Sequence, residues 1–280
     1  MITGANSGIG KETGVKLAEM GATVVMVCRS RERGAKAMKE IKERGRSDSV
    51  ELLLADLASF DSVRALARGF LEKHDDLHVL INNAGGVRLM RSTTVDGFET
   101  TFQIDYLSHF LLTNLLLGAL KRSAPSRIVN VSSASHYRGH LNMEDLQMKK
   151  GYGVMRAYGQ AKLAQVLFTY ELARRLKGTG VTANSLHPGA VATNIWKGPM
   201  GPLRFLGNIS RLFLITPQKG AETPVYLASS SDVEGVSGKY FDLKHEKESS
   251  AESYDVSLGR RLWEESEKMT GLAVSAATSA

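Results

Sequence analysis

The sequence is poor in the residues that stabilise small secreted proteins and fibrous proteins. It has one cysteine in 280 residues, Cys28, and a single thiol cannot close an internal disulfide. It also has no Pro-rich or low-complexity tract. The fold therefore does not depend on an oxidising compartment, and we expect a cytoplasmic protein.

No stretch of the sequence predicts a membrane span. A transmembrane helix needs about 18 or more consecutive apolar residues. The most apolar stretch, residues 110–120, is interrupted by Thr113, Asn114 and Gly118. The N-terminal residues do not have the basic and apolar regions of a signal peptide. We therefore expect no membrane span in this chain.

Two classes of binding protein are disfavoured by what is missing. Lys and Arg number 36 against 29 Asp and Glu, a net charge of +7, but these cations form no basic stripe with interleaved aromatic residues. We therefore expect no nucleic-acid partner. The 7 histidines are scattered and have no cysteine near them at the spacing of metal ligands, so we expect no metal site.

Short apolar runs alternate with longer amphipathic stretches along the chain. The predicted strands are residues 23–28, 50–54, 79–81, 127–131 and 181–186. The predicted helices are residues 10–20, 31–44, 59–73, 97–121 and 157–176. This alternation is typical of βαβ units, and strands that are apolar throughout are covered on both faces. We therefore predict a single α/β domain, a doubly wound parallel sheet of Rossmann type.

The domain is expected to extend over residues 1–250, with a C-terminal helix and tail at 251–280. The least regular segment is residues 190–217, which mixes glycines and prolines with Trp196, Phe205 and Phe213. Long irregular segments in compact domains usually serve function. We predict a lid that closes over a hydrophobic ligand, with a peripheral helical insertion as the alternative.

A glycine-rich loop, Thr3–Gly10 (TGANSGIG), precedes the first predicted helix. Glycines let the backbone turn tightly and approach a pyrophosphate, and the free N–H groups of a helix N-terminus attract an anion. The spacing G-x3-G-x-G alone is a weak signal, because an ordinary strand-to-helix turn would also explain it.

Arg29 follows the next predicted strand, where a dinucleotide fold usually has an acidic residue that binds the adenosine ribose. A guanidinium there suits a 2′-phosphate instead, with Ser7, Arg31 and Arg33 as further candidates. The hypothesis is that the chain binds NADP(H) rather than NAD(H). The alternative is that Arg29 is a solvated surface residue.

Several motifs occur in the order found in short-chain dehydrogenases/reductases. They are Thr3–Gly10, Asp56-Leu57, residues 82–85 (NNAG), Ser132-Ser133, residues 158–162 (YGQAK) and Pro188-Gly189 with Thr193. The chain resembles this family over about residues 1–245, and the segments RIVNVSS, HPGAVAT and GVSGKYF resemble its retinol dehydrogenase-like branch. The resemblance implies hydride transfer between a carbonyl compound and its alcohol on a bound nicotinamide cofactor.

Tyr158 and Lys162 have i, i+4 spacing and would share one face of a helix. An ammonium beside a phenol favours the phenolate, which brings the proton-transfer group towards neutral pH. The resemblance makes Tyr158 the catalytic acid or base and Lys162 its partner, which also holds the nicotinamide ribose. It makes Ser133, rather than Ser132, the residue that binds the substrate oxygen.

The resemblance also implies a set of cofactor-binding residues. The loop residues would bind the pyrophosphate, Asp56 and Leu57 the adenine, and the turn at 83–85 the adenosine ribose, while the segment from Pro188 would fix the carboxamide. The full expected set is Gly4, Asn6, Ser7, Gly8, Ile9, Gly10, Arg29, Asp56, Leu57, Asn83, Ala84, Gly85, Tyr158, Lys162, Pro188, Gly189, Val191 and Thr193.

Two features depart from the family pattern. Asp105 occupies the position of the usual fourth catalytic residue, an Asn that helps hold a water near the lysine. A carboxylate there would raise the pKa of Lys162 and oppose phenolate formation at Tyr158, unless it is protonated or bridged by water and has little effect. We expect slower or alkaline-shifted turnover.

The second departure is a truncated first strand, because only Met1 and Ile2 precede Thr3, and a central strand needs about five residues. We expect a truncated reading frame or fragment, although the fold could tolerate a shortened strand. An upstream membrane anchor, as some relatives have, would be lost with those residues.

The sequence favours an NADP(H)-dependent oxidoreductase that interconverts a hydrophobic aldehyde or ketone, such as a retinoid, and its alcohol. An NADPH-binding scaffold or sensor with little turnover is the alternative, and Asp105 and the short first strand support it. The long helices at 97–121 and 157–176 resemble those that pair subunits in relatives, so a homo-oligomer is compatible with the sequence.

Overall fold

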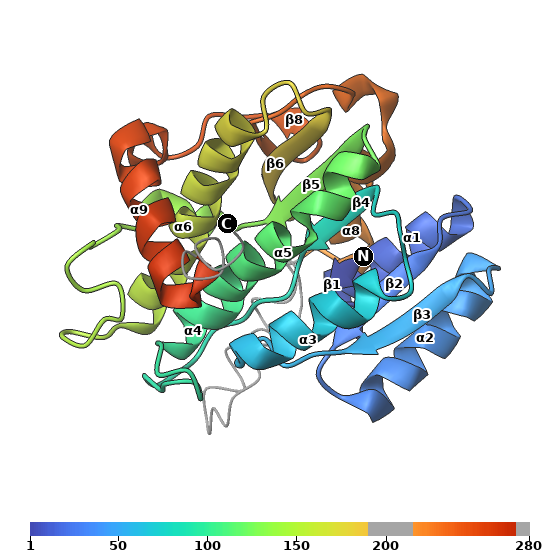
Figure 1. Ribbon diagram of the computed structural model, residues 1–280, viewed down its shortest axis with the longest axis horizontal. Coiled ribbons are helices and arrows are strands. Elements are labelled where there is room, and N and C mark those ends of the chain that lie inside the picture. The colour runs from blue at the N-terminus through green and yellow to red at the C-terminus, as the bar shows by residue number, and fades with distance from the viewer. Residues whose placement is uncertain (190–214, 273–280) are drawn as a thin grey trace.

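The computed structural model describes residues 1–189 and 215–272. Its centre is an eight-stranded sheet with the strand order β3-β2-β1-β4-β5-β6-β7-β8 (Figure 1). The strands are β1 (Ile2–Thr3), β2 (Val24–Cys28), β3 (Val50–Leu54), β4 (Val79–Asn82), β5 (Ser126–Val131), β6 (Val181–His187), β7 (Tyr240–Asp242) and β8 (His245–Glu246). All neighbouring strands are parallel except β7 and β8, which are antiparallel. This order confirms the predicted doubly wound sheet.

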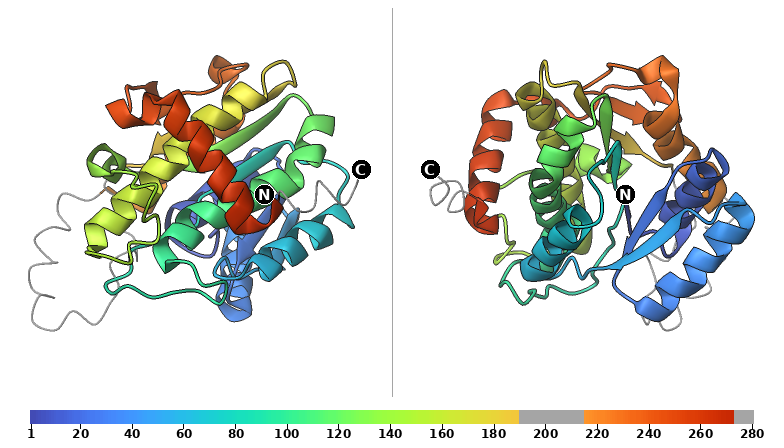
Figure 2. Two further views of the ribbon diagram at one scale, coloured as in Figure 1. Left: turned by 60° about the vertical axis from the view of Figure 1, so that its left-hand side comes forward. Right: turned by 45° about the vertical axis from the view of Figure 1, so that its right-hand side comes forward.

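Helices cover both faces of the sheet (Figure 2). One layer consists of α1 (Gly8–Glu19), α2 (Arg31–Gly45) and α8 (Pro217–Ser229), and the other of α3 (Phe60–Leu71), α5 (Ser108–Arg122), α6 (Val154–Arg175) and α9 (Val256–Thr270). None of the helices in the described part of the chain is both long and apolar enough to cross a membrane.

The apolar run of β2 follows from this double coverage. All five of its residues are buried. Val24 and Met26 belong to the hydrophobic cluster beneath α1, α2 and α8, whereas Val25 and Val27 belong to the cluster beneath α3, α5 and α6. Successive side chains of a strand point to opposite faces, so both faces of β2 favour apolar residues.

The prediction of one continuous helix over residues 97–121 is wrong. Glu99 caps a short helix, α4 (Thr100–Phe102), by accepting hydrogen bonds from the N–H groups of Thr101 and Phe102. A π-helical turn, Gln103–Leu107, follows, and α5 begins only at Ser108. Such a turn holds one more residue than an α-helical turn and often marks a functional site. This one contains Asp105.

Other boundaries also differ from the predictions. The first helix begins at Gly8 rather than Gly10, and α8, β7 and β8 were not predicted. Most of the predicted lid, including Val191 and Thr193, lies outside the described residues, and Pro217 already begins α8. The division into residues 1–250 and 251–280 stays a prediction.

The first strand is as short as predicted. It has two residues and pairs with β2 on one side and β4 on the other. The amino group of Met1 donates a hydrogen bond to the Val79 carbonyl at 2.7 Å. Burial of this amine lowers its pKa to about 5. A cavity of about 720 Å³ lies beside it, between the beginnings of β2 and β4, and its lining includes Val25, Phe70 and Leu77.

An apolar segment of four or five residues added in front of Met1 is expected to raise Tm by about 5 °C or more, because it would pair with β2 and β4 and bury apolar surface in this cavity. A Gly-Ser segment of equal length is the control, since it moves the N-terminal amine equally far but adds no apolar side chains. Equal melting temperatures for the two variants would contradict the prediction.

Candidate active site

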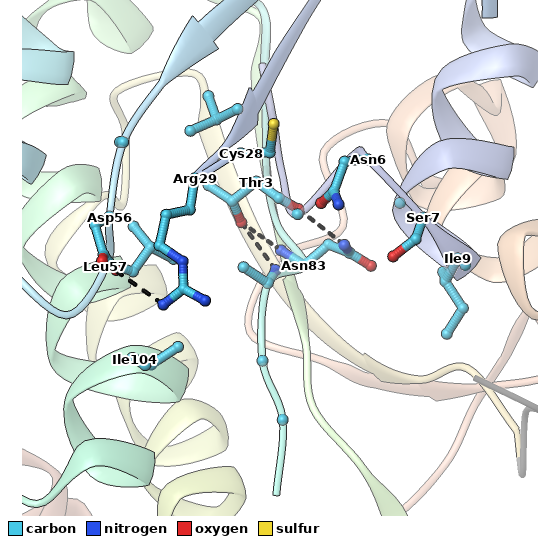
Figure 3. Close-up of a pocket in the computed structure, with 18 of the residues that line it drawn as sticks. Thr3, Asn6, Ser7, Ile9, Cys28, Arg29, Asp56, Leu57, Asn83 and Ile104 are labelled. Atoms are coloured by element: carbon cyan, nitrogen blue, oxygen red, sulfur yellow. Dashed lines mark hydrogen bonds and ion pairs between the residues drawn. The ribbon is translucent and has the colours of Figure 1, made fainter. Parts of the chain in front are cut away.

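A cavity of about 350 Å³ lies at the carboxyl ends of β1, β2 and β4 (Figure 3). The predicted cofactor residues that line it are Gly4, Asn6, Ser7, Gly8, Ile9, Gly10, Arg29, Asp56, Leu57, Asn83, Ala84 and Gly85. The carboxyl edge of a parallel sheet, where the strand order reverses, is the usual ligand crevice of doubly wound folds. The residues come from four segments that are far apart in the sequence.

The glycine-rich loop leaves the N-terminus of α1 open. Ser7 is the N-cap residue, but its side chain makes no capping hydrogen bond, and the first turn of α1 has no acidic residue. The loop is also tightly packed: a Cβ atom on Gly10 would lie 2.4 Å from Nδ2 of Asn83 and 2.7 Å from the Gly4 carbonyl oxygen. The backbone N–H groups at this helix end are therefore available to an anion, and a pyrophosphate fits their chemistry.

Arg29 and Asp56 lie side by side in the lining of the cavity (Figure 3). An Nη1 atom of Arg29 lies 3.7 Å from Oδ2 of Asp56, and both side chains are exposed, at 60% and 41%. Asp56 also accepts a hydrogen bond from the N–H of Ala58. An ion pair this exposed contributes little stability, so the guanidinium is free to bind another anion.

The turn after β4 is held against the glycine-rich loop by Thr3. The Thr3 hydroxyl accepts hydrogen bonds from the N–H groups of Asn83 and Ala84 at 2.9 and 3.0 Å. The Asn83 side chain donates to the Thr3 carbonyl at 2.8 Å. These bonds fix the floor of the cavity.

Tyr158 and Lys162 lie one turn apart on α6, as their spacing predicts, and both are buried. The Lys162 ammonium lies 5.5 Å from the centre of the Tyr158 ring. It donates hydrogen bonds to the Val131 carbonyl at 3.1 Å and to Oε1 of Gln165 at 3.0 Å. The end of β5 and the helix itself therefore hold the ammonium in place.

The two serines after β5 have different environments. The Ser132 hydroxyl is buried and donates to the Lys162 carbonyl at 2.9 Å, which is a packing role. Ser133 is only partly buried, and its hydroxyl accepts from the N–H of Ser135 and also contacts Tyr158. Of the two, only Ser133 offers a hydroxyl to a ligand beside Tyr158.

The environment of Tyr158 sets its acidity through opposing effects. Burial raises the pKa of its phenol, the Lys162 charge lowers it, the Asp105 charge raises it, and the hydrogen bond with Ser133 lowers it. Lys162 is thus the main group that opposes the cost of burying a phenolate. The Asp105 charge has the opposite effect, because it raises the pKa of Tyr158.

Asp105 contacts Lys162 directly. One of its carboxylate oxygens lies 3.3 Å from the ammonium, and the two side chains are 1% and 4% exposed. The carboxylate also accepts from the N–H of Gly86 at 2.9 Å. Gly85 permits this approach, because a Cβ there would lie 2.8 Å from Oδ2 of Asp105. Burial raises the pKa of Asp105, and the Lys162 charge opposes this rise.

The structure thus brings most of the predicted site residues to one edge of the sheet. Pro188 and Gly189 follow the end of β6, and Gly189 has a φ of +89°, which favours glycine. Sequence reasoning missed Gln165, Ile104 and the structural role of Thr3. It also gave no role to His109, although a histidine four residues after Asp105 would be expected to lie next to it on a helix.

Comparison with known proteins identifies the family of this chain. The model of the short chain dehydrogenase family matches residues 1–199. The chain belongs to the short-chain dehydrogenase family. Mouse retinol dehydrogenase 13 is 46% identical over 98% of this chain and 84% of its own length, and human retinol dehydrogenase 11 is 44% identical over 98% and 86%. This confirms the retinol dehydrogenase-like resemblance.

Two solved structures extend the comparison. An uncharacterized protein from Mycobacterium Paratuberculosis superposes with a TM-score of 0.79 at 33% identity, over 96% of this chain and 92% of that one. The Pseudomonas aeruginosa RhlG complex with NADP superposes with a TM-score of 0.67 at 25% identity, over 86% and 92%. Members of this short-chain dehydrogenase family are oxidoreductases that bind NAD(P).

Proposed function

We propose that this short-chain dehydrogenase interconverts a hydrophobic aldehyde or ketone and its alcohol with NADP(H) as the cofactor. One observation carries the proposal: a phenol, an ammonium and a serine hydroxyl from α6 and the end of β5 lie together, on the sheet edge that also carries the nucleotide cavity. Ser133, Tyr158 and Lys162 are the residues to which we assign the proton-transfer chemistry.

Each of these residues has a task that follows from its surroundings. Tyr158 donates a proton to the carbonyl oxygen during reduction and accepts it back during oxidation. Lys162 stabilises the phenolate form, because its ammonium lowers the pKa of Tyr158. Ser133 donates a hydrogen bond to the substrate oxygen, since its hydroxyl is the partly exposed one beside the phenol.

The cofactor would be held by the residues that line the cavity, and its nicotinamide would supply or accept the hydride when bound. The α1 N-terminus suits the pyrophosphate, and the Arg29 guanidinium, with Arg33 beside it, suits a 2′-phosphate. Pro188 and Gly189, with Val191 and Thr193, are the proposed contacts of the carboxamide. The NADP complex of the RhlG relative is compatible with this preference.

The hydrophobic substrate class is supported by the relatives and by the sequence. The curated relatives with 43–47% identity are retinol dehydrogenases. The sequence between Trp196 and Leu214 is rich in Leu and Phe. A retinoid or another long aldehyde is the substrate that these features favour.

A direct assay tests the proposal. The protein is mixed with NADPH or NADH and with aliphatic, aromatic and retinoid aldehydes, and the loss of nicotinamide absorbance is followed. We expect turnover that is faster with NADPH and with the longer aldehydes. No turnover with any of the carbonyl compounds would contradict the enzymatic proposal.

The second candidate is an NADPH-binding scaffold or sensor with little turnover. The observation that favours it is the direct ion pair between Asp105 and Lys162, because the Asp105 charge raises the pKa of Tyr158. Tight NADPH binding without oxidation by any aldehyde would favour this candidate over the enzyme.

The Arg29→Ala variant is expected to bind NADPH at least about tenfold more weakly, because it loses a charge-assisted hydrogen bond to the 2′-phosphate. NADH lacks that phosphate, so its affinity should change little. Fluorescence titration of both cofactors measures the effect. Arg31, which the sequence also offered as a phosphate ligand, is not among the residues described as lining the cavity, so Arg31→Ala is the neighbouring control. Unchanged NADPH affinity in Arg29→Ala would exclude this role.

The Asp105→Asn variant is expected to shift the pH profile of alcohol oxidation to lower pH by about one unit. Oxidation requires the Tyr158 phenolate, and the Asp105 charge raises the pKa of Tyr158, so removing the charge forms the phenolate at lower pH. The measurement is kcat against pH for wild type and variant. Superimposable profiles would show that the carboxylate has no electrostatic effect on the phenol.

A further inference from the structure

His109 is a buried histidine that the proposed chemistry does not use. It is the second residue of α5 and is 1% exposed. Its Nε2 atom lies 3.0 Å from the Thr3 hydroxyl oxygen, and its Nδ1 atom lies 3.2 Å from the carbonyl oxygen of Asp105. One ring therefore contacts both the start of the glycine-rich loop and the π-helical turn.

The hydrogen bonds around Thr3 determine which ring nitrogen carries the proton. The Thr3 hydroxyl already accepts from the N–H groups of Asn83 and Ala84, so its two lone pairs are occupied and it can only donate to His109. A second acceptor near it in the described part of the chain, the Ile81 carbonyl, is more distant at 3.5 Å. Nε2 of His109 is therefore the acceptor.

The proton of the neutral ring must then lie on Nδ1, which donates to the Asp105 carbonyl. The surroundings support the neutral form, because burial and, to a smaller extent, the nearby Lys162 charge lower the pKa of His109 to about 3. Both ring nitrogens are thus satisfied by a single tautomer.

This tautomer joins two parts of the site. On one side, Thr3 anchors the turn at Asn83 against the glycine-rich loop. On the other, the π-helical turn presents the Asp105 carboxylate to Lys162 at 3.3 Å. The Nδ1–H bond fixes the backbone of that turn, so it also sets where the carboxylate lies.

We propose that His109 is a positioning residue, which holds the Asp105 backbone through its Nδ1–H and so orients the Asp105–Lys162 pair relative to the cofactor loop. The proposal extends the proposed function and rests on it for the catalytic effect. Nothing in it requires His109 to contact substrate or to change its charge.

Two substitutions separate the two hydrogen bonds of the ring. His109→Asn keeps a donor at the place of Nδ1, whereas His109→Gln keeps an acceptor at the place of Nε2. We expect His109→Gln to lower kcat about tenfold or more with little change in the KM for NADPH, because the turn that holds Asp105 shifts and the Lys162 ammonium paired with it is displaced from Tyr158. His109→Asn is expected to retain most of the wild-type kcat.

His78→Asn is the matched control, since that side chain is exposed at the opposite end of the sheet. Melting temperatures of all variants are measured in parallel. Equal kcat values for the Asn and Gln variants, or losses that follow melting temperature alone, would overturn the proposal.

A spectroscopic measurement tests the hydrogen bonds independently of turnover. In protein labelled with ¹⁵N-histidine, NMR should show the His109 ring neutral with its proton on Nδ1 throughout neutral and mildly acidic pH, and His109→Asn assigns the signal. An Nε2–H tautomer, or a ring that titrates near pH 6.5, would overturn the assignment. Absence of turnover in the wild type would instead count against the proposed function.

Discussion

Replacement of Tyr158 by phenylalanine is expected to lower kcat by about 10³-fold, because the variant has no group that can give a proton to the substrate oxygen. The phenol is hydrogen-bonded to the Ser133 hydroxyl, and its acidity depends on Lys162. The affinity for NADPH should change little, since the glycine-rich loop and Arg29 are untouched. Stopped-flow reduction of an aldehyde and fluorescence titration of NADPH measure the two quantities.

A second tyrosine on the same helix provides the control. Tyr170 is also buried on α6, and its hydroxyl bonds Ser249 at 2.7 Å, away from the nucleotide cavity. Tyr170→Phe removes the same atom from the same helix and should keep wild-type turnover. If Tyr158→Phe retained its activity, or if both variants lost it equally, the assignment of Tyr158 as the proton donor would be wrong.

Replacement of Lys162 by methionine is expected to destabilise the fold as well as stop turnover. The Asp105 carboxylate, 1% exposed, would lose its buried partner, and breaking such a pair costs about 3–5 kcal/mol. The loss in the free energy of unfolding should be greatest above neutral pH and smaller in acid. Burial raises the pKa of Asp105, and without Lys162 nothing on α6 opposes this rise. In acid the carboxyl group is therefore protonated and neutral, whereas above neutral pH it is an unpaired buried charge. Urea unfolding at several pH values measures this dependence.

The double variant Lys162→Met/Asp105→Asn separates stability from catalysis. It leaves no charge at the site of the Asp105–Lys162 pair, so it should recover most of the free energy of unfolding that the single variant loses, and it should remove the pH dependence that the unpaired Asp105 gives to the single variant. Turnover should remain at least about 10²-fold below wild type, because the ammonium that lowers the pKa of Tyr158 is gone. A double variant as unstable as Lys162→Met would show that the ion pair is not the source of the loss.

The fold class could be read from local patterns. The strand β2, which lies between two helix layers, is apolar on both faces, and short, mainly apolar runs alternate with longer amphipathic stretches along the chain. The short strands β7 and β8 and the helix α8 were missed, because a two- or three-residue strand has too few residues to show a period.

The break before α5 was also missed. Residues 97–121 have the composition of one helix, yet the chain forms a π-helical turn at Gln103–Leu107. That turn contributes the Asp105 carboxylate to Lys162 and the Asp105 carbonyl to His109. The Lys162 ammonium that pairs with this carboxylate comes from α6, which is distant in sequence, so the local pattern gave no sign of the contact.

The sequence alone determined the alternation of strands and helices, the family to which the chain belongs, and the pairing of Tyr158 with Lys162, since all of these depend on residues close together in the chain or on motif order. Only the tertiary structure decided that Asp105 contacts Lys162 directly and that His109 bridges Thr3 and Asp105. The physical reason is that the tautomer of a buried ring and the partner of a buried charge depend on groups from separate segments, and folding is what brings those groups together.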